Sequence, residues 1–160
     1  MLSIKKVNIE NYKGFQGKFS IELNKNLNIL VGNNEVGKST IIEAIHLALS
    51  GLLNGRYLRN ELSQYLFNNN VEEKYISSLK TRSPLDPPSI LIEVFFKGEE
   101  LPLLEGNGNS DKEKGCGVSF KIEFDKEYQS EYEELIKTEV QTIPIEYYKI
   151  TWRSFAREGV

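Results

Sequence analysis

The fold of this chain is decided by nine consecutive residues, Gly32-Asn33-Asn34-Glu35-Val36-Gly37-Lys38-Ser39-Thr40. They fit the phosphate-loop pattern G-x-x-x-x-G-K-[ST] at every defined position. The glycines permit positive φ angles, so that successive backbone N–H groups can turn toward phosphate oxygens. Lys38 supplies a positive charge for the β- and γ-phosphates, and Ser39 supplies a hydroxyl ligand for Mg²⁺. The stretch therefore predicts a site for a nucleoside triphosphate.

The flanking residues favour a phosphate loop over a glycine turn that happens to precede a helix. A short apolar run at residues 27–31 predicts a buried strand that ends at Gly32. Residues 38–50 are apolar on nearly every side, which predicts a buried helix that stops at Gly51. At average amino-acid frequencies, a chance match in a chain of this length has a probability well below about 1%. A strand leading into the loop and a helix leading out of it indicate an α/β fold.

Apolar alternation predicts a mixed sheet around this core. We expect residues 27–31 to lie centrally in the sheet, with the 38–50 helix packed against them. Strands with one-sided alternation should form a largely antiparallel part that is covered on one face only. A further strand is expected at the end of the chain. The expected strands, beside 27–31, lie near residues 4–9, 18–23, 90–96, 118–124 and 145–152.

Helical spacing of apolar residues predicts three further helices, at residues 58–66, 71–79 and 128–136. The polar, glycine-rich stretch at 106–117 is predicted to be a disordered loop. These patterns suggest a single domain in three consecutive parts. They are a phosphate-loop core at 1–51, a helical insertion at 52–88 and a strand-rich part at 89–160.

The composition indicates one soluble domain without an overall cationic surface. Of the 160 residues, 39% are apolar and 27% are charged, with a formal net charge of −3, which excludes disordered, collagen-like and disulfide-stapled chains. Residues 111–139 carry nine acidic and five basic groups, so a nucleic acid would contact a local patch or regions outside this chain. Cys116 is the single cysteine, and no signal peptide or 18-residue apolar run occurs. We therefore expect a cytoplasmic protein without a membrane partner.

Two parts of the N-terminal half resemble the ABC-type ATPase heads of the chromosome-maintenance and recombination-repair ATPases. Residues 4–15 read I-x-x-V-x-I-x-N-Y-K-G-F, and the phosphate loop continues as G-N-N-E-V-G-K-S-T-I-I-E-A-I. Stretches at 88–94, 117–124 and 143–155 resemble, more specifically, the overcoming-lysogenization-defect (OLD) family of ATP-dependent endonucleases. The resemblance implies a P-loop NTPase fold, ATP and Mg²⁺ as cofactors, homo-oligomers formed through the head, and DNA bound by regions outside this chain.

The motif and the resemblance together give the expected nucleotide site. In similar heads the basic residue of an Asn-aromatic-basic-Gly turn reaches the nucleotide, which implies that role for Lys13. No catalytic residue is assigned, and Ser39 is the expected metal ligand. The expected nucleotide-binding residues are Lys13, Asn33, Asn34, Glu35, Val36, Gly37, Lys38, Ser39 and Thr40.

Several parts of a complete head are missing from the sequence. It has no Ser-Gly-Gly signature loop, no apolar strand ending in Asp-Glu and no carboxylate cluster of a nuclease. We therefore expect the front portion of a larger head, inactive in isolation, within an ATPase that controls DNA processing or cleavage. Two alternatives remain open: a nucleotide-binding interaction module without hydrolysis, and a DNA-repair ATPase that lacks a nuclease. A small P-loop kinase fits the strand-rich insertion poorly.

Four other residues carry weaker signals. His46 is expected to be a packing or surface residue, because the chain has no second histidine to complete a metal site. Cys116 lacks a neighbouring base that would make it a catalytic thiol. Asp125 follows a half-exposed strand, which disfavours it as the acidic residue of a Walker B strand. Glu93 points away from the apolar face of its strand and is a candidate to replace the Mg²⁺-sensing glutamine of similar heads.

Overall fold

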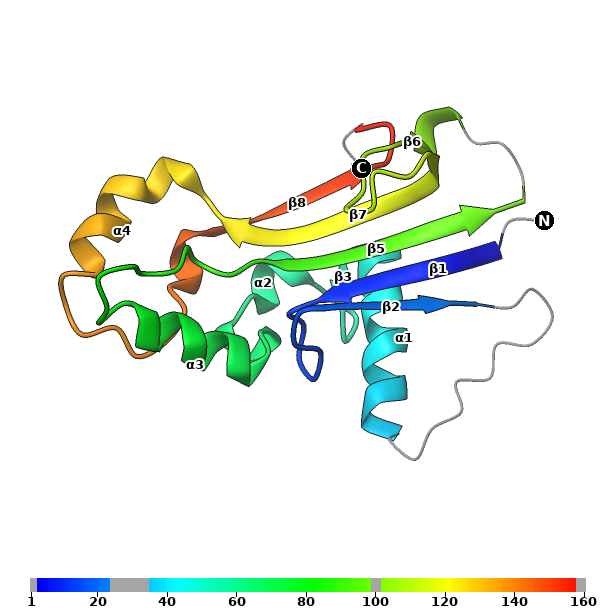
Figure 1. Ribbon diagram of the computed structural model, residues 1–160. Coiled ribbons are helices and arrows are strands. Elements are labelled where there is room, and N and C mark those ends of the chain that lie inside the picture. Colours follow the sequence, from blue (N-terminus) through cyan, green and yellow to red (C-terminus); the bar gives the residue numbers. More distant parts are fainter. Residues whose placement is uncertain (1–2, 24–34, 99–101, 158–160) are drawn as a thin grey trace.

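A computed structural model describes residues 3–23, 35–98 and 102–157 of the chain. Its main element is a six-stranded sheet with the order β2-β1-β5-β7-β6, in which β8 pairs with β7 (Figure 1). Every pair of neighbouring strands is antiparallel, which confirms the expected antiparallel part. The predicted central strand at 27–31 lies outside the described residues. The strands are β1 (Ser3–Glu10), β2 (Lys18–Glu22), β5 (Ile90–Lys97), β6 (Glu105–Gly106), β7 (Gly115–Phe124) and β8 (Tyr148–Ser154).

The helices lie on one side of this sheet and at its end (Figure 1). The longest, α1, leads into a small hairpin of β3 (Leu52–Leu53) and β4 (Arg56–Tyr57). Gly51 adopts a φ of 71° and its N–H donates to the Leu47 carbonyl, so the helix stops at the glycine that the sequence indicated. The helices are α1 (Glu35–Ser50), α2 (Leu58–Glu61), α3 (Asn69–Ser78) and α4 (Gln129–Leu135).

Within the described residues, four short 3-10 helices connect these elements, and two of them correct the sequence prediction. The single helix expected at 58–66 is wrong, because α2 ends at Glu61 and η1 (Gln64–Leu66) follows after extended residues. The strand expected from residue 145 begins later, because η4 (Ile145–Tyr147) precedes β8. The other two are η2 (Pro102–Leu104) and η3 (Lys126–Tyr128).

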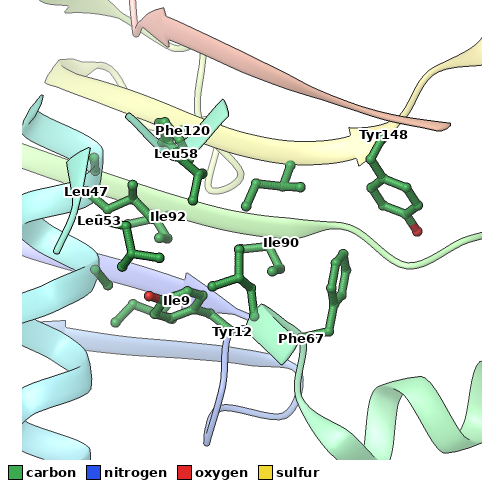
Figure 2. Close-up of a cluster of buried hydrophobic side chains, with 14 of the residues drawn as sticks. Ile9, Tyr12, Leu47, Leu53, Leu58, Phe67, Ile90, Ile92, Phe120 and Tyr148 are labelled. Atoms are coloured by element: carbon green, nitrogen blue, oxygen red, sulfur yellow. The ribbon is translucent and has the colours of Figure 1, made fainter. Parts of the chain in front are cut away.

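The hydrophobic core lies on the face of the sheet that α1 covers and continues along the sheet to Phe67 and Tyr148 (Figure 2). Alternate residues of the strands point into it, as the period of two requires, and α1 adds its buried face. The helix is less buried than its composition predicted, because Ile42 is 61% exposed and Leu49 is 43% exposed. One face of α1 is therefore open to solvent among the described residues. The labelled side chains of the core are Ile9, Tyr12, Leu47, Leu53, Leu58, Phe67, Ile90, Ile92, Phe120 and Tyr148.

The second face of the sheet is covered too, which the sequence did not predict. On β5, Glu93 and Phe95 are buried although they alternate with the core residues Ile92 and Val94. Phe155 packs edge-to-face on Phe95 with 4.7 Å between the ring centroids. The polar stretch 106–117 was expected to be disordered, but its ends belong to β6 and β7, and Ser110 in its middle donates two hydrogen bonds to the Glu93 carboxylate. The expectation that the sheet is covered on one face only is therefore wrong for β5.

None of the helices in the described part of the chain combines the length and the apolar character needed to cross a membrane.

Candidate nucleotide-binding site

The N-terminal part of α1 carries the predicted phosphate-binding residues. Lys38 is half-buried, Ser39 is exposed and Thr40 is buried. The fully buried positions of α1 (Ala44, Leu47 and Ala48) gather in its second half, so the beginning of the helix projects away from the core (Figure 1). Because the N-terminus of a helix carries partial positive charge, the described start of α1 has the electrostatic sign that suits an anion.

Part of the predicted site falls outside what the structure describes. Asn33 and Asn34 lie outside the described residues, and so do the side chains of Glu35 and Val36. Gly37 is a half-buried residue of α1. The geometry of the site therefore rests on residues 37–40 and on the side chains that approach them from other elements.

A turn after β1 reaches α1 through its side chains. The Tyr12 hydroxyl and the Lys13 ammonium both donate to the same carboxylate oxygen, Oε1 of Glu43 on α1. Asn11 and Lys13 adopt φ angles of 60° and 47°, a conformation that asparagine accepts more readily than most residues. This geometry connects Lys13, the predicted nucleotide contact, to the helix that begins with the phosphate loop.

The backbone of this turn is fixed by the segment before α3. The Lys13 N–H donates to the Leu66 carbonyl at 2.8 Å, and the Asn68 side-chain amide donates to the Lys13 carbonyl at 2.8 Å. Asn68 also caps α3, because its side-chain oxygen accepts from the N–H groups of Asn70 and Val71. The backbone N–H and the backbone carbonyl of Lys13 are therefore both hydrogen-bonded, which fixes the point from which its side chain extends.

Burial and hydrogen bonding define the charge state of this cluster. Tyr12 is fully buried, and its burial, together with its hydrogen bond to the Glu43 carboxylate, raises the pKa of the Tyr12 phenol well above its usual value. The phenol therefore remains a hydrogen-bond donor throughout the neutral range. The Lys13 ammonium lies 5.5 Å from the centroid of the Tyr12 ring, within the range of a cation–π contact. Tyr12 and Lys13 thus approach Glu43 together.

A surface cavity of about 380 Å³ lies beside Ser39 and Glu43. Ile42 and His46 of α1 form one wall, and residues of the β3–β4 hairpin form the other. Small-molecule sites commonly occupy volumes of this order. His46 is exposed, as expected for a surface histidine. Among residues 3–23, 35–98 and 102–157, no group of three or more His, Cys, Asp or Glu side chains could hold a metal ion.

Glu43 is the site residue that sequence reasoning missed. A signal was present, since Glu43 follows Ser39 by four residues and residues at that spacing share one face of a helix. What the sequence could not reveal is that Lys13, thirty positions earlier, pairs with it. Pairing of that kind depends on how the turn and the helix pack.

Two of the weaker candidates have other roles. Glu93 is 1% exposed and accepts hydrogen bonds from Asn8 and Ser110 on the sheet face opposite the α1 core. Asp125 accepts from the Glu127 N–H at 3.0 Å and thereby caps η3. Glu93 and Asp125 therefore both support local structure, Glu93 by holding Ser110 over the sheet and Asp125 by capping η3. Cys116 lies in β7.

Comparison with known proteins identifies the family. The family model described as an AAA domain (AAA_23) matches residues 6–155. The chain belongs to this family. Its mixed α/β fold with an antiparallel sheet is accordingly that of a P-loop NTPase resembling an ABC-type ATPase head, as the sequence predicted.

Several curated proteins are similar to parts of the chain. A probable ATPase of retron Ec83 from Escherichia coli is 34% identical over 104 residues, which is 64% of this chain and 17% of that protein. The DNA replication and repair protein RecF of Clostridium tetani is 32% identical over 74 residues, which is 46% of this chain and 19% of the relative. RecF of Clostridium kluyveri is 28% identical over 125 residues and covers 64% of this chain and 33% of the relative. The matches thus span a third or less of these relatives.

A solved structure from work on ATP-driven dimerization and DNA-stimulated activation of SMC ATPases is also similar to this chain. It is 20% identical, covers 74% of this chain and 61% of its own, and has a TM-score of 0.42.

Proposed function

We propose that the chain binds ATP with Mg²⁺ through residues 32–40, as part of an ATPase that controls DNA processing by regions outside these 160 residues. The observation that carries the proposal is the complete G-x-x-x-x-G-K-[ST] motif, whose Lys38 and Ser39 belong to the exposed beginning of α1. Membership of the AAA domain family supports the nucleotide-binding part. The names of the RecF relatives, DNA replication and repair proteins, support the DNA-related part.

Each residue of the proposed site has a distinct task. In this proposal the backbone N–H groups of the phosphate-loop motif would donate to the phosphates, and the positive end of α1 would favour their charge. Lys38 binds the β- and γ-phosphates, Ser39 offers its hydroxyl to the metal, and Lys13 approaches the nucleotide from the turn after β1. Mg²⁺ held by the Ser39 hydroxyl would neutralise part of the negative charge of the triphosphate. The donor set of ammonium and hydroxyl groups fits a triphosphate with its metal ion.

Substitution of Lys38 and Ser39 tests this site. Lys38→Ala removes the charge at the phosphates and Ser39→Ala removes the metal ligand, so each should weaken ATP binding by about 2 kcal/mol, the scale of a charged hydrogen bond, which is about 30-fold in Kd. Isothermal titration calorimetry of chain 1–160 with Mg·ATP measures this directly. Lys74→Ala on exposed α3 is the matched lysine control and should bind as the wild type does. Equal affinity of wild type and Lys38→Ala would contradict the assignment.

The finer assignment to the OLD family is part of the same proposal. It is supported by the stretches at 88–94, 117–124 and 143–155, and it adds ATP-controlled DNA cleavage by a nuclease outside this chain. A DNA-repair ATPase without a nuclease is the competing function, and the RecF relatives favour it. Incubation of the full-length protein with linear and supercoiled DNA, Mg²⁺ and ATP separates the two. Cleavage that is lost with Lys38→Ala supports the OLD assignment, whereas intact DNA supports the repair ATPase.

A further inference from the structure

The shared carboxylate of Glu43 is a feature that the phosphate-loop motif does not include. We infer that Glu43 is a positioning residue that holds the Lys13 ammonium at the nucleotide site and thereby sets the affinity for ATP. The inference rests on the proposed function, because it assumes that ATP binds at the start of α1. It goes beyond that function by assigning a role to a residue outside the motif.

Helix geometry places Glu43 near the expected phosphates. Four residues separate it from Ser39, which corresponds to a rise of about 6 Å and a rotation that leaves both residues on one face. Side chains of a helix tilt toward its N-terminus, so the Glu43 carboxylate lies over the turn that contains Ser39. Both residues line the same cavity. Glu43 is therefore the side chain that links the Lys13 ammonium to the helix face of the predicted metal ligand.

The Lys13 ammonium retains N–H donors for a ligand after it pairs with Glu43. A lysine ammonium carries three N–H donors, and it contacts a single carboxylate oxygen of Glu43. The Lys13 backbone is fixed by hydrogen bonds to Leu66 and Asn68, so the conformational freedom that remains is that of the long side chain. The ammonium can keep the carboxylate and offer its remaining donors to an anionic phosphate. Glu43 thus orders the one flexible part of Lys13 before ATP arrives.

The position of Glu43 is itself fixed. The buried Tyr12 hydroxyl donates to the same oxygen that Lys13 contacts, and the Glu43 side chain is only 25% exposed. The carboxylate is therefore a rigid acceptor and not a freely solvated surface group. An ion pair that served stability alone would make no contribution to ATP affinity through Lys13, and this difference can be measured.

A double-mutant cycle on ATP binding tests the inference. Mg·ATP affinity is measured by calorimetry for wild type, Glu43→Gln, Lys13→Met and the double variant, with Lys38→Ala in the same series. Glu43→Gln should weaken ATP binding about three- to tenfold, the usual cost of ordering one long side chain on binding. In the Lys13→Met background the same change should leave ATP affinity unchanged or slightly tighter, because the ammonium to be positioned is absent. Thermal unfolding of every variant checks that it is folded.

Charge-matched controls separate positioning from electrostatics. Removal of a negative charge near ATP should by itself tighten ATP binding, so weaker binding by Glu43→Gln has the opposite sign from a pure charge effect. Glu134→Gln and Lys137→Met change the charge in the same way at an exposed pair on and after α4, with 2.8 Å between nitrogen and oxygen, and should leave ATP affinity unchanged. Should Glu43→Gln not fold, Glu43→Asp is expected to give a smaller loss that also disappears with Lys13→Met.

The outcomes distinguish the inference from the proposed function. The role of Glu43 is overturned, and the phosphate loop stays assigned, if Glu43→Gln weakens ATP binding equally in the wild-type and Lys13→Met backgrounds. It is overturned as well if Glu43→Gln leaves ATP binding unchanged or tightens it in the otherwise wild-type chain. Wild-type chain that binds ATP no better than Lys38→Ala overturns the proposed function and the inference with it. Weakening that requires Lys13 supports both.

Discussion

Gly117 shows how one position can determine which side chain covers a face of the sheet. It lies in β7, and its carbonyl accepts from the Phe155 N–H at 2.9 Å. A Cβ atom added at Gly117 would lie 2.2 Å from the Phe155 ring and 2.4 Å from the Val94 carbonyl oxygen. Contacts that short force backbone or ring to move. Glycine at this position therefore lets Phe155 (1% exposed) cover the second face of the sheet.

Gly117→Ala should consequently destabilise the fold. Overpacking in a filled site costs about 1–3 kcal/mol of unfolding free energy, and urea denaturation measures the loss. Gly115→Ala in the same strand is the matched control, because its added Cβ meets nothing within 4 Å. The role given to Gly117 would be refuted by equal stability of the two variants.

At the residue scale, the sequence indicates members of the candidate site only where a local motif or a resemblance defines them. Lys38 and Ser39 follow from the spacing of the phosphate loop, and Lys13 follows from the resemblance of its turn. The sequence did not single out Glu43 near the site or Gly117 in the sheet, because their contacts are with Lys13, 30 positions away, and with Phe155, 38 positions away. A single sequence contains no direct record of such contacts.

The segment between β6 and β7 shows the same limit for a whole element. Its polar, glycine-rich composition predicts disorder, yet Ser110 donates to Glu93 through both its N–H and its hydroxyl. Asn109 is buried, and Asp111 accepts from Asn8 at 3.0 Å and pairs with Lys6 at 2.7 Å. Polar residues that would be solvated in an isolated loop thus find partners on β1 and β5. Composition alone could not reveal this, because the partners come from remote strands.

The break at residues 62–63 has a comparable cause. Leu58, Leu62 and Leu66 keep helical spacing, but the chain is extended at Leu62 and Ser63. The Leu66 carbonyl accepts from Lys13, and Phe67 forms a bridge with Tyr12. An unbroken helix would leave these two residues displaced from the turn after β1. Tertiary pairing therefore overrides local helix propensity here, whereas α1 forms and ends at Ser50 as its long apolar pattern predicted.

Asp111 makes the attachment of the segment sensitive to acid. Hydrogen bonds from Lys18, Lys6 and Asn8 hold the pKa of the Asp111 carboxyl well below its usual range. Because the folded pKa lies below the unfolded value of about 3.9, the carboxylate stabilises the fold above that pH. Its contribution to the unfolding free energy is lost as the pH falls below about 4.

Asp111→Asn should therefore lower stability at pH 7 but not at low pH. We expect a loss of about 1 kcal/mol, since Lys18 is 37% exposed and solvent screens the pair. The difference between wild type and variant should shrink as the pH falls from 4, in urea denaturation series at several pH values. Glu113→Gln, whose carboxylate is 49% exposed and 3.6 Å from Lys6, should have a smaller effect. A difference that stays constant with pH would contradict the role of the Asp111 charge.

At the scale of the whole molecule, the antiparallel strands were predictable from the sequence, but the order in which they pair was not. Period-two alternation identified β1, β2, β5 and β7, because a strand with one apolar face records that face in its sequence. The chain pairs β1 with β5, which are separated by α1, α2 and α3. This pairing brings the turn at Lys13 beside α1, so the fold itself assembles the two halves of the proposed nucleotide site.

The 160-residue chain should bind ATP and hydrolyse it very slowly. Phosphoryl transfer to water requires charge stabilisation opposite the phosphate loop and a group that positions the attacking water. The sequence supplies the loop and Lys38, but it contains no Ser-Gly-Gly signature loop and no apolar strand that ends in Asp-Glu. Loss of one stabilising donor costs about 10²- to 10³-fold in rate, and more than one is missing from this chain.

Phosphate release by purified chain 1–160 measures this turnover, with Lys38→Ala as the control for contaminating ATPases. We expect wild type and Lys38→Ala to release phosphate at the same low rate, although the wild type binds ATP about 30-fold more tightly. The two measurements together separate binding from chemistry, because Lys38 is required for the first and insufficient for the second. Rapid hydrolysis by the wild type that disappears in Lys38→Ala would mean that residues already in this chain close the γ-phosphate side of the site. The most direct candidate would then be Glu43, the carboxylate that lines the cavity beside Ser39.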